Sequence, residues 1–416
     1  MQTFNESDKS AASDFDVIVV GAGMVGSTLS WLLADAGMRV ALVEAKARPP
    51  SHAVSGLPSP RVSALTPVSQ RLLTYIGAWP LMVNARVTPY RHMQVWDAEG
   101  SGEIGFSADE AGVPVLGHIV ENDVTLSALH TTLQGQGRVS AFFGTPVETL
   151  GGSASGRRLG LASGQSLHAP LVVAADGARS LLRDMAGIDV ISEAMGQDAV
   201  VTTVRCDKPH GDTARQAFVD GCPLAFLPLT VDRDAHYCSI VWSTTPAHAK
   251  QLCKLYPAAL GEALGGALAG RMGTVTACDR AYRFPLVQRH ATCYVQPHFA
   301  LVGDAAHSLH PLAGQGVNLG LMDAAVLADE VTAAWRRGAP WGELSTLNRY
   351  ARRRRGDNRA MLGLMKGFKT LFGSHDPALT LMRNLGMSGM HRLTPLKRLV
   401  MRQATGERGR LPAPCR

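Results

Sequence analysis

Short apolar runs rich in β-branched residues recur along the chain and predict buried β-strands. They occupy residues 16–20, 39–43, 171–175 and 299–303. Two further stretches, 27–36 and 317–334, are apolar with helical periodicity and predict α-helices, the first of them closed by Gly37. Strands that alternate with helices in this way are typical of an α/β domain built on a parallel sheet.

A glycine motif connects the first strand to the first helix. Gly21, Gly23 and Gly26 form the pattern G-x-G-x-x-G, and Glu44 ends the next strand. In this context the first glycine allows a tight turn, the second lets a diphosphate approach the backbone, and the third lets the helix pack closely on the strand. Glu44 would accept hydrogen bonds from an adenosine ribose and disfavours a 2′-phosphate. The sequence therefore predicts dinucleotide binding by a Rossmann-like domain.

A second glycine-rich stretch follows the strand at 299–303. Asp304 stands at the strand end, where it could bond a ribose or lie near a diphosphate, and the predicted helix begins near Gly316. The backbone amides from Gly314 to Asn318 would face an anionic ring edge at the helix N-terminus. The alternative is a plain loop between a strand and a helix.

Two weaker patterns lie between these motifs. Asp176 and Gly177 follow the strand at 171–175, where Asp-Gly is a common turn and carries little weight alone. Residues 222–229 and 237–242 predict paired strands joined by the polar turn 232–234, and residues 94–96 predict another strand. We expect these strands to form a sheet that covers one side of the nucleotide site.

The order G-x-G-x-x-G, Asp-Gly, Gly-Asp resembles that of the single-component flavoprotein aromatic hydroxylases. Residues 310–320, with Asp323 shortly after, resemble the signature of the ubiquinone-biosynthesis hydroxylases within that group. Residues 61–65, 117–122 and 225–229 are also similar to that family. The resemblance runs from about Phe15 to about Arg402, and its motifs specify the family rather than one member.

The resemblance implies FAD as the resident cofactor, NAD(P)H as a transient reductant, dioxygen as the second substrate and a polyprenylated phenol or benzoquinol as the aromatic one. A reduced flavin can form a C4a-hydroperoxide that presents an electrophilic oxygen to such a ring. Pro311 and Gln315 would lie beside the isoalloxazine, and a base that deprotonates the phenol would activate it. His118, His307 and His310 are candidates for that base, or else structural residues. The expected cofactor-binding residues are Gly21, Gly23, Gly26, Glu44, Arg61, Asp176, Gly177, Gly303, Asp304, Gly314, Gln315, Gly316 and Asn318.

Three functions remain open at this point. The first is an FAD-dependent monooxygenase, the second a flavin reductase or dehydrogenase on the same scaffold, and the third a non-catalytic flavin-binding member of a biosynthetic complex. The chain has one G-x-G-x-x-G in strand context, so we expect the reductant to dock briefly and leave. Other quinone-biosynthesis proteins are expected partners.

The motif positions predict three parts. A discontinuous FAD-binding domain would comprise residues 15–85, 115–185 and 280–345. A smaller β-rich substrate domain would comprise residues 86–114 and 186–279. Residues 346–416 would form a helical basic segment. The predicted class is thus α/β with an inserted α+β substrate sheet.

Charge is unevenly distributed along the 416 residues. The net charge is +7, whereas residues 350–416 hold fifteen Lys or Arg and three acids, which gives +12 there and −5 elsewhere. Such a segment could meet an anionic membrane surface or an acidic partner. Nucleic acid is the weakest option because aromatic interleaving is missing. Apolar residues within 361–372 have helical spacing, which is more typical of a helix that packs on a domain than of a membrane-binding face. Arg352 to Arg355 are expected to form a solvated helix face.

Composition excludes several other classes. The seven cysteines show no C-x-x-C pair, which argues against a disulfide framework or a zinc site and fits a reducing compartment. Residues 1–14 lack a signal-peptide pattern, and no apolar run reaches the ~18 residues of a membrane span. We expect a cytoplasmic protein without a metal, either peripheral at the inner membrane or held in a soluble complex.

Overall fold

The computed structural model describes residues 14–48, 57–98, 100, 102–153, 155–308, 316–372, 406–407 and 409–416. Its first layer is a six-stranded sheet in which all neighbouring strands are parallel except β19 and β20 at one edge. The strands follow the order β19 (Val295–Gln296), β20 (Phe299–Leu301), β12 (Val172–Ala174), β1 (Val17–Val20), β2 (Val40–Glu44) and β8 (Val139–Phe143). All four strands predicted from apolar runs belong to this sheet, so that prediction is confirmed.

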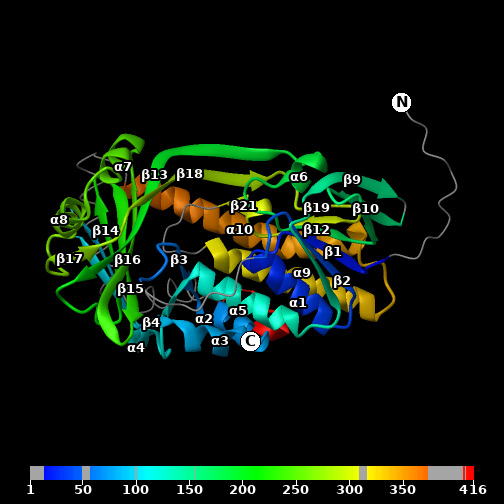
Figure 1. Ribbon diagram of the computed structural model, residues 1–416, viewed down its shortest axis with the longest axis horizontal. Helices are drawn as coiled ribbons and strands as arrows, with labels where there is room; N and C mark the ends of the chain where they lie inside the picture. Colours follow the sequence, from blue (N-terminus) through cyan, green and yellow to red (C-terminus); the bar gives the residue numbers. More distant parts are fainter. Residues whose placement is uncertain are drawn as a thin grey trace.

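Helices cover this sheet because each has one apolar face. They are α1 (Met24–Asp35), α5 (Asn122–Gln134), α9 (Gly316–Arg336) and α10 (Leu344–Phe372). Helix α1 packs against both α5 and α9, and α9 packs against α10. Figure 1 shows α1 and α9 beside β1 and β2. The main core lies between these helices and the sheet and includes the fully buried Ile18, Leu29 and Leu327.

The second layer is a nine-stranded, largely antiparallel sheet at the opposite end of the molecule (Figure 1). The predicted hairpin is confirmed, because β15 pairs with β16, and the turn residues Asp232 and Arg233 have positive φ angles of 49° and 68°. Helices α7 (Pro246–Leu252) and α8 (Pro257–Ala267) pack on this sheet over a second core. The strands are β21 (His307–Ser308), β18 (Tyr282–Ala291), β13 (Val190–Cys206), β16 (Asp234–Thr244), β15 (Cys222–Val231), β14 (Thr213–Val219), β5 (His92–Asp97) and β6 (Glu103–Ser107), with β17 (Val275–Cys278) on β13.

Smaller elements connect the two layers. One three-stranded sheet consists of β3 (Val62–Leu65), β7 (Gly117–Glu121) and β4 (Thr88–Tyr90), and another of β11 (Ser166–Ala169), β10 (Gly156–Leu161) and β9 (Val147–Ser153). The long strands β13 and β18 form a ribbon that extends from the nine-stranded sheet toward the six-stranded one (Figure 1). The remaining helices are α2 (Pro67–Tyr75), α3 (Ala78–Ala85), α4 (Ala108–Ala111) and α6 (Leu181–Met185), with 3₁₀ turns at Gly303–Ala305 and Ala413–Cys415. The predicted α/β class with an inserted β-rich sheet is confirmed.

The C-terminal basic segment corrects one expectation. Helix α10 includes residues 361–372, as the spacing predicts, but Arg352 to Arg355 do not form a solvated face. Arg354 is buried and paired with Asp323, and Arg353 pairs with Asp329 and Glu330 on α9. Only Arg352 of the four is exposed. The run of arginines therefore fastens α10 to α9.

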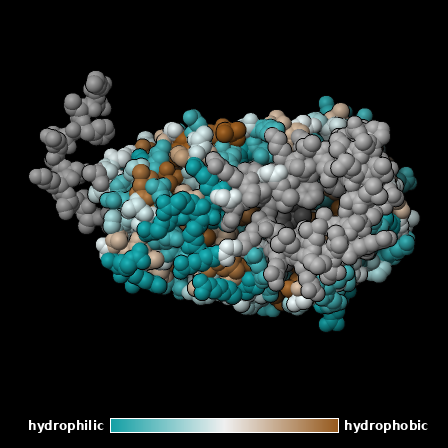
Figure 2. Space-filling view, turned by 180° about the vertical axis from the view of Figure 1, so that it is seen from behind, coloured by the Kyte–Doolittle hydropathy of each residue, from teal (hydrophilic) through white to brown (hydrophobic). Residues whose placement is uncertain are grey.

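Within the described residues, no helix is long and apolar enough to cross a membrane. Figure 2 shows that the described part of the rear face is largely hydrophilic, with small separate apolar patches.

Candidate functional site

The glycines of the first motif are required for three different reasons. Gly21 has a φ of 106°, and a Cβ added to it would lie 2.3 Å from the carbonyl oxygen of Ala175. A Cβ on Gly26 would lie 1.9 Å from the carbonyl oxygen of Gly21. A Cβ on Gly23, by contrast, would meet no atom within 4 Å. The turn is therefore closed on its protein side and open at Gly23, where a diphosphate needs room.

The side chains of Glu44 and His130 both form hydrogen bonds with the backbone of Ala22 in this turn. The backbone N–H of Ala22 donates to Glu44 Oε2 over 2.9 Å, and Lys46 N–H donates to Glu44 Oε1 over 2.9 Å. On the other side, His130 Nε2 lies 2.8 Å from the carbonyl oxygen of Ala22, which can only accept, so Nε2 is the donor. Glu44 keeps lone pairs that can accept ribose hydroxyls. His130 was missed because nothing in the sequence near it points 108 residues back to the turn.

The Asp-Gly turn after β12 lies beside this motif. Gly177 has a φ of 87°, and a Cβ there would meet no atom within 4 Å. Asp176 accepts from Leu182 N–H at the start of α6, whereas its Oδ1 atom is buried and has no hydrogen-bond partner among the described residues. Burial raises the pKa of Asp176, and the hydrogen bonds around it oppose that rise. A ligand hydroxyl, or an ordered water beside a bound ligand, could donate a hydrogen bond to this oxygen.

The turn after β20 presents Asp304. Gly303 has a φ of 59°, and a Cβ on it would press against Val25 at 3.1 Å. The Asp304 side chain is accessible to solvent, yet the protein around it is dense enough to raise its pKa by desolvation, against the opposing charges of His307 and Arg61. We interpret this combination as an acid that faces an open recess surrounded by protein atoms.

A buried charge cluster lies directly behind that turn; the Asp323 cluster consists of Asp323, His307 and Arg354. Asp323 Oδ2 lies 2.6 Å from His307 Nε2, and Arg354 Nε donates to Asp323 Oδ1 over 2.6 Å. Gly303 N–H also donates to Asp323 Oδ2, over 3.1 Å. Burial would raise the pKa of Asp323, but the neighbouring His307 and Arg354 outweigh it and lower the pKa to about 2. Asp323 is therefore a carboxylate that only accepts, and His307 Nε2 carries the hydrogen.

The Asp323 cluster continues through hydrogen bonds to the ribbon. Arg354 donates to Asn358 Oδ1 over 3.0 Å, and Asn358 Nδ2 donates to the hydroxyl of Tyr294 over 3.2 Å. That hydroxyl lies 3.1 Å from His290 Nε2 on β18. The sequence indicates Asp323 only as part of the family signature, and it places Arg354 on a solvated face. Asp323 is one of three acids in residues 317–334, and it is the one with a leucine on both sides at the helical spacing of four residues.

The start of α9 is fixed by Asn318. Its Nδ2 donates to Ala64 O over 2.8 Å, and its Oδ1 accepts from Thr66 N–H over 3.0 Å and from Ser69 Oγ over 2.7 Å. The side chain is thus occupied by protein partners, and the backbone amide is what it offers a ligand. A Cβ on Gly316 would meet no atom within 4 Å.

The candidate histidines occupy different environments. His307 is buried in the Asp323 cluster. His118 on β7 is buried, its ring centroid lies 4.8 Å from that of Trp79, and burial lowers its pKa to about 4. His310 lies outside the described residues, as do Pro311, Gly314 and Gln315.

A small apolar cavity of ≈20 Å³ lies between the nine-stranded sheet and the β3–β7–β4 sheet. Ala64 belongs to its wall and also accepts the hydrogen bond from Asn318, so the cavity adjoins the start of α9. Burial raises the pKa of Tyr90 in this wall to about 12, so its hydroxyl keeps its hydrogen at neutral pH and can donate a hydrogen bond. The other wall residues are Met93, Ile119, Ala214, Arg215, Gln216, Ala225 and Leu227.

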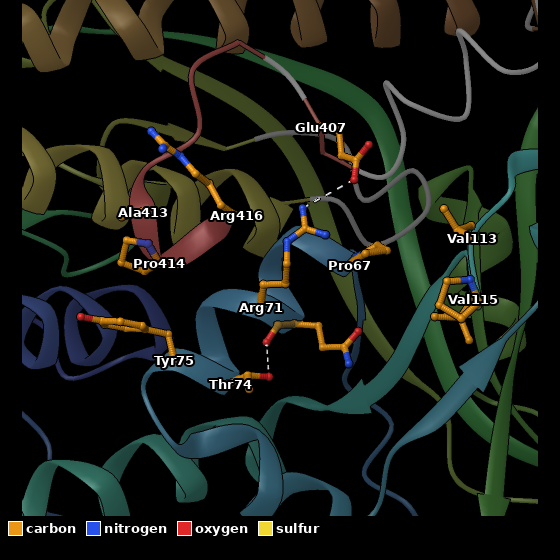
Figure 3. A pocket seen from close by; sticks show the side chains of 12 residues that line it. Pro67, Arg71, Thr74, Tyr75, Val113, Val115, Glu407, Ala413, Pro414 and Arg416 are labelled. Carbon is orange, nitrogen blue, oxygen red and sulfur yellow. Dashed lines mark hydrogen bonds and ion pairs between the residues drawn. The ribbon is translucent and has the colours of Figure 1, made fainter.

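A larger cavity of ≈440 Å³ is lined by residues of α2 and by residues near the C-terminus. Figure 3 shows Arg71 pointing toward Glu407 across it, with the two charged groups 3.6 Å apart. Arg71 Nε also donates to the carbonyl oxygen of Cys415 over 2.9 Å, and the Cys415 side chain is fully buried. The end of the chain is thereby fastened to the nucleotide-binding layer.

Comparison with known proteins shows the family of the chain. A family model described as FAD binding domain matches residues 14–362. The chain is 38% identical over 391 residues to 3-demethoxyubiquinol 3-hydroxylase of Escherichia coli (strain K12), which covers 94% of this chain and 98% of that one. It is 34% identical over 391 residues to the ubiquinone hydroxylase UbiL of Rhodospirillum rubrum, which covers 94% of this chain and 89% of that one.

Solved structures show the same fold. The p-nitrophenol 4-monooxygenase PnpA of Pseudomonas putida DLL-E4 superimposes with a TM-score of 0.74 at 21% identity, covering 95% of this chain and 99% of that one. A variant of HpxO from Klebsiella pneumoniae, complexed with FAD, gives a TM-score of 0.71 at 19% identity over 93% of this chain and 99% of that one.

Proposed function

The chain belongs to the family of FAD-binding ubiquinone-biosynthesis hydroxylases, and we propose that it hydroxylates the aromatic ring of a polyprenylated phenol or benzoquinol intermediate. The observation that carries the proposal is the open cradle at Gly23 and Asp304, connected through Asn318 and Ala64 to an apolar cavity. In the overall reaction, dioxygen places one oxygen atom in the new ring hydroxyl and the other in water, with two electrons from NAD(P)H and one proton.

FAD is the cofactor of this family, and bound FAD supplies two-electron redox chemistry and activates dioxygen. The chain's own residues suit it. The open space at Gly23 would admit the diphosphate, Glu44 would accept from the ribose, and Asp304 would accept from hydroxyls of the cofactor. The N-terminus of α9, with Gly316 open to approach, favours negative charge nearby. Gln315 and Pro311 stay predicted neighbours of the flavin ring.

The apolar cavity would have to widen to hold the substrate ring, because ≈20 Å³ is room for about one water molecule. Tyr90 keeps its proton at neutral pH and can donate a hydrogen bond to a ring oxygen, and Gln216 offers an amide in the same wall. His118 is neutral at physiological pH because its pKa is about 4. We assign His307 a positioning role, because its Nε2–H is committed to Asp323. His310 stays a candidate for the base.

Oxygen incorporation tests the proposal. The purified protein should be yellow with non-covalent FAD, and under ¹⁸O₂ the product of a demethoxyubiquinol substrate should gain one ¹⁸O atom. That compound comes first because a 38% identical relative is named for it. Deletion of the gene should cause an under-hydroxylated quinone intermediate to accumulate. Substrate reduction without ¹⁸O uptake would favour the reductase hypothesis, and bound FAD without turnover would favour the non-catalytic one.

The basic segment supports a proposed peripheral contact with the membrane in which such a substrate resides. Residues 350–416 carry +12, and each basic residue near an anionic surface contributes about 1 kcal/mol. Lys397, Arg398 and Arg402 lie outside the described residues. Replacing all three with Gln should lower product formation in cells while sparing FAD content, and membrane association should weaken as ionic strength rises. Unchanged activity and fractionation would contradict the contact.

A further inference from the structure

Strand β18 carries two exposed aromatic side chains, each beside an arginine. Tyr282 is 42% exposed and Phe284 is 40% exposed. Because side chains alternate along a strand, both rings lie on the same face, and their Cα atoms are about 7 Å apart along the strand. The guanidinium of Arg280 lies 5.8 Å from the Tyr282 ring centroid, and that of Arg61 lies 5.7 Å from the Phe284 centroid. We call these four residues the β18 patch.

The β18 patch lies beside the cofactor recess. Arg61 is close enough to Asp304 to oppose the rise in its pKa, and the same guanidinium stands over Phe284. One side chain therefore joins the patch to the acid that faces the recess.

The patch is positively charged and open to solvent. Across the described residues, no acidic side chain forms an ion pair with Arg61 or Arg280, although the neighbouring Arg283 pairs with Asp198 at 3.2 Å. Arg61 has Asp304 nearby but forms no ion pair with it, so both guanidinium groups can still complement a diphosphate, and exposed aromatic faces complement flat heterocycles such as adenine or nicotinamide.

We propose that the β18 patch is the transient docking site of the reduced nicotinamide dinucleotide. Arg61 and Arg280 bind its diphosphate, and Tyr282 and Phe284 stack with its rings. This assignment rests on the proposed function in one respect, namely that the flavin is reduced by NADH or NADPH. In that step the C4–H bond of the dihydronicotinamide breaks, the hydrogen and both bonding electrons pass to FAD with one proton from water, and the oxidised nicotinamide leaves. A surface patch also explains why one G-x-G-x-x-G suffices.

Anaerobic stopped-flow reduction of the purified holoenzyme tests the site. The flavin absorbance near 450 nm is followed at rising NADH in one series and rising NADPH in another, which yields an apparent Kd and a limiting rate for each. Arg280→Gln and Tyr282→Ser should each raise the apparent Kd about three- to tenfold, since exposed charge and stacking contacts are modest. FAD content should not change. Arg271→Gln is the matched control, because Arg271 also stands over an aromatic ring, Trp96, on the same sheet.

A second measurement locates the contact directly. Labelling with an arginine-specific dicarbonyl, read by peptide mass spectrometry, should show NADH or NADPH protecting Arg280 but not Arg271. Unchanged Kd values together with unprotected Arg280 would overturn the assignment, as would a wild-type flavin that neither nucleotide reduces. Failure of the hydroxylase proposal looks different, since nucleotide-dependent reduction would persist without ¹⁸O in the product.

Discussion

Asp323→Asn should destabilise the protein much more than Asp329→Asn, the same substitution at a more exposed position of α9. The substitution keeps the shape of the side chain and removes the charge that Arg354 and His307 both contact at 2.6 Å. Both Asp323 and Arg354 are buried, so solvent cannot replace the lost interaction. Removing one partner of a buried pair costs about 3–5 kcal/mol, because the other charge stays buried without compensation.

The lowered pKa of Asp323 makes the same interaction depend on pH. A carboxyl whose pKa falls from 3.8 to about 2 on folding contributes about 2 kcal/mol of stability at neutral pH. Because the folded pKa is the lower one, this contribution is complete above pH ~4 and disappears as the pH falls toward 2. The stability difference between wild type and Asp323→Asn should therefore be constant from pH 8 to 5 and shrink below pH 4.

Thermal unfolding and denaturant titration measure both effects. With an unfolding entropy of about 2.1 cal/mol/K per residue, a loss of 3–5 kcal/mol lowers the Tm of this chain by about 3–6 °C. Asp329→Asn is the control, because Asp329 lies on the same helix and pairs with Arg353, but its side chain is 40% exposed. That change should cost at most about 1 kcal/mol. Equal losses in the two variants, or a difference that stays constant below pH 4, would refute the reasoning.

Three further predictions concern the cofactor and His118. Gly23→Val should unfold at the Tm of the wild-type apoprotein, because a Cβ at residue 23 meets no protein atom within 4 Å. The variant should retain no FAD, because the side chain would fill the space for the diphosphate. Full flavin occupancy in absorbance spectra would exclude this placement of the diphosphate. Asp304→Ala should weaken FAD binding about ten- to a hundredfold in fluorescence titrations, the effect of losing a charged hydrogen bond, and an unchanged Kd would remove Asp304 from the site. His118 has a folded pKa of about 4, below its unfolded value of 6.5, so its contribution of up to about 3 kcal/mol to stability is present above pH 6.5 and lost as the pH falls to 4. In His118→Gln the denaturation midpoint should therefore depend less on pH across that window than in wild type. The same dependence on pH in both proteins would count against this role.

The elements that could be predicted are those whose signal is local. The hairpin of β15 and β16 follows from two apolar runs around a polar turn, and the Gly21 turn follows from the strand before it and the helix after it. Arg354 could not be separated from its neighbours in a run of four arginines, because its burial depends on an acid 31 residues earlier on another helix. The role of His130 could not be predicted either, because its partner, Ala22, lies 108 residues earlier in the chain. Periodicity identifies an apolar face, but which polar residue it encloses depends on the partner helix.

The strand order of the nucleotide-binding sheet has a consequence for protein synthesis. β1 lies between β2 and β12, and β20 follows on β12, so the cradle needs β20 and α9, which lie about 280 residues after β1. At roughly 5–20 residues per second, a ribosome needs about 15–60 s to cover that distance. During this interval the apolar strands β1 and β2 have emerged without their later neighbours, and the flavin has no complete site to bind. Cofactor capture is therefore a late event in the synthesis of this chain, because the cradle stays incomplete until β20 and the start of α9 have emerged.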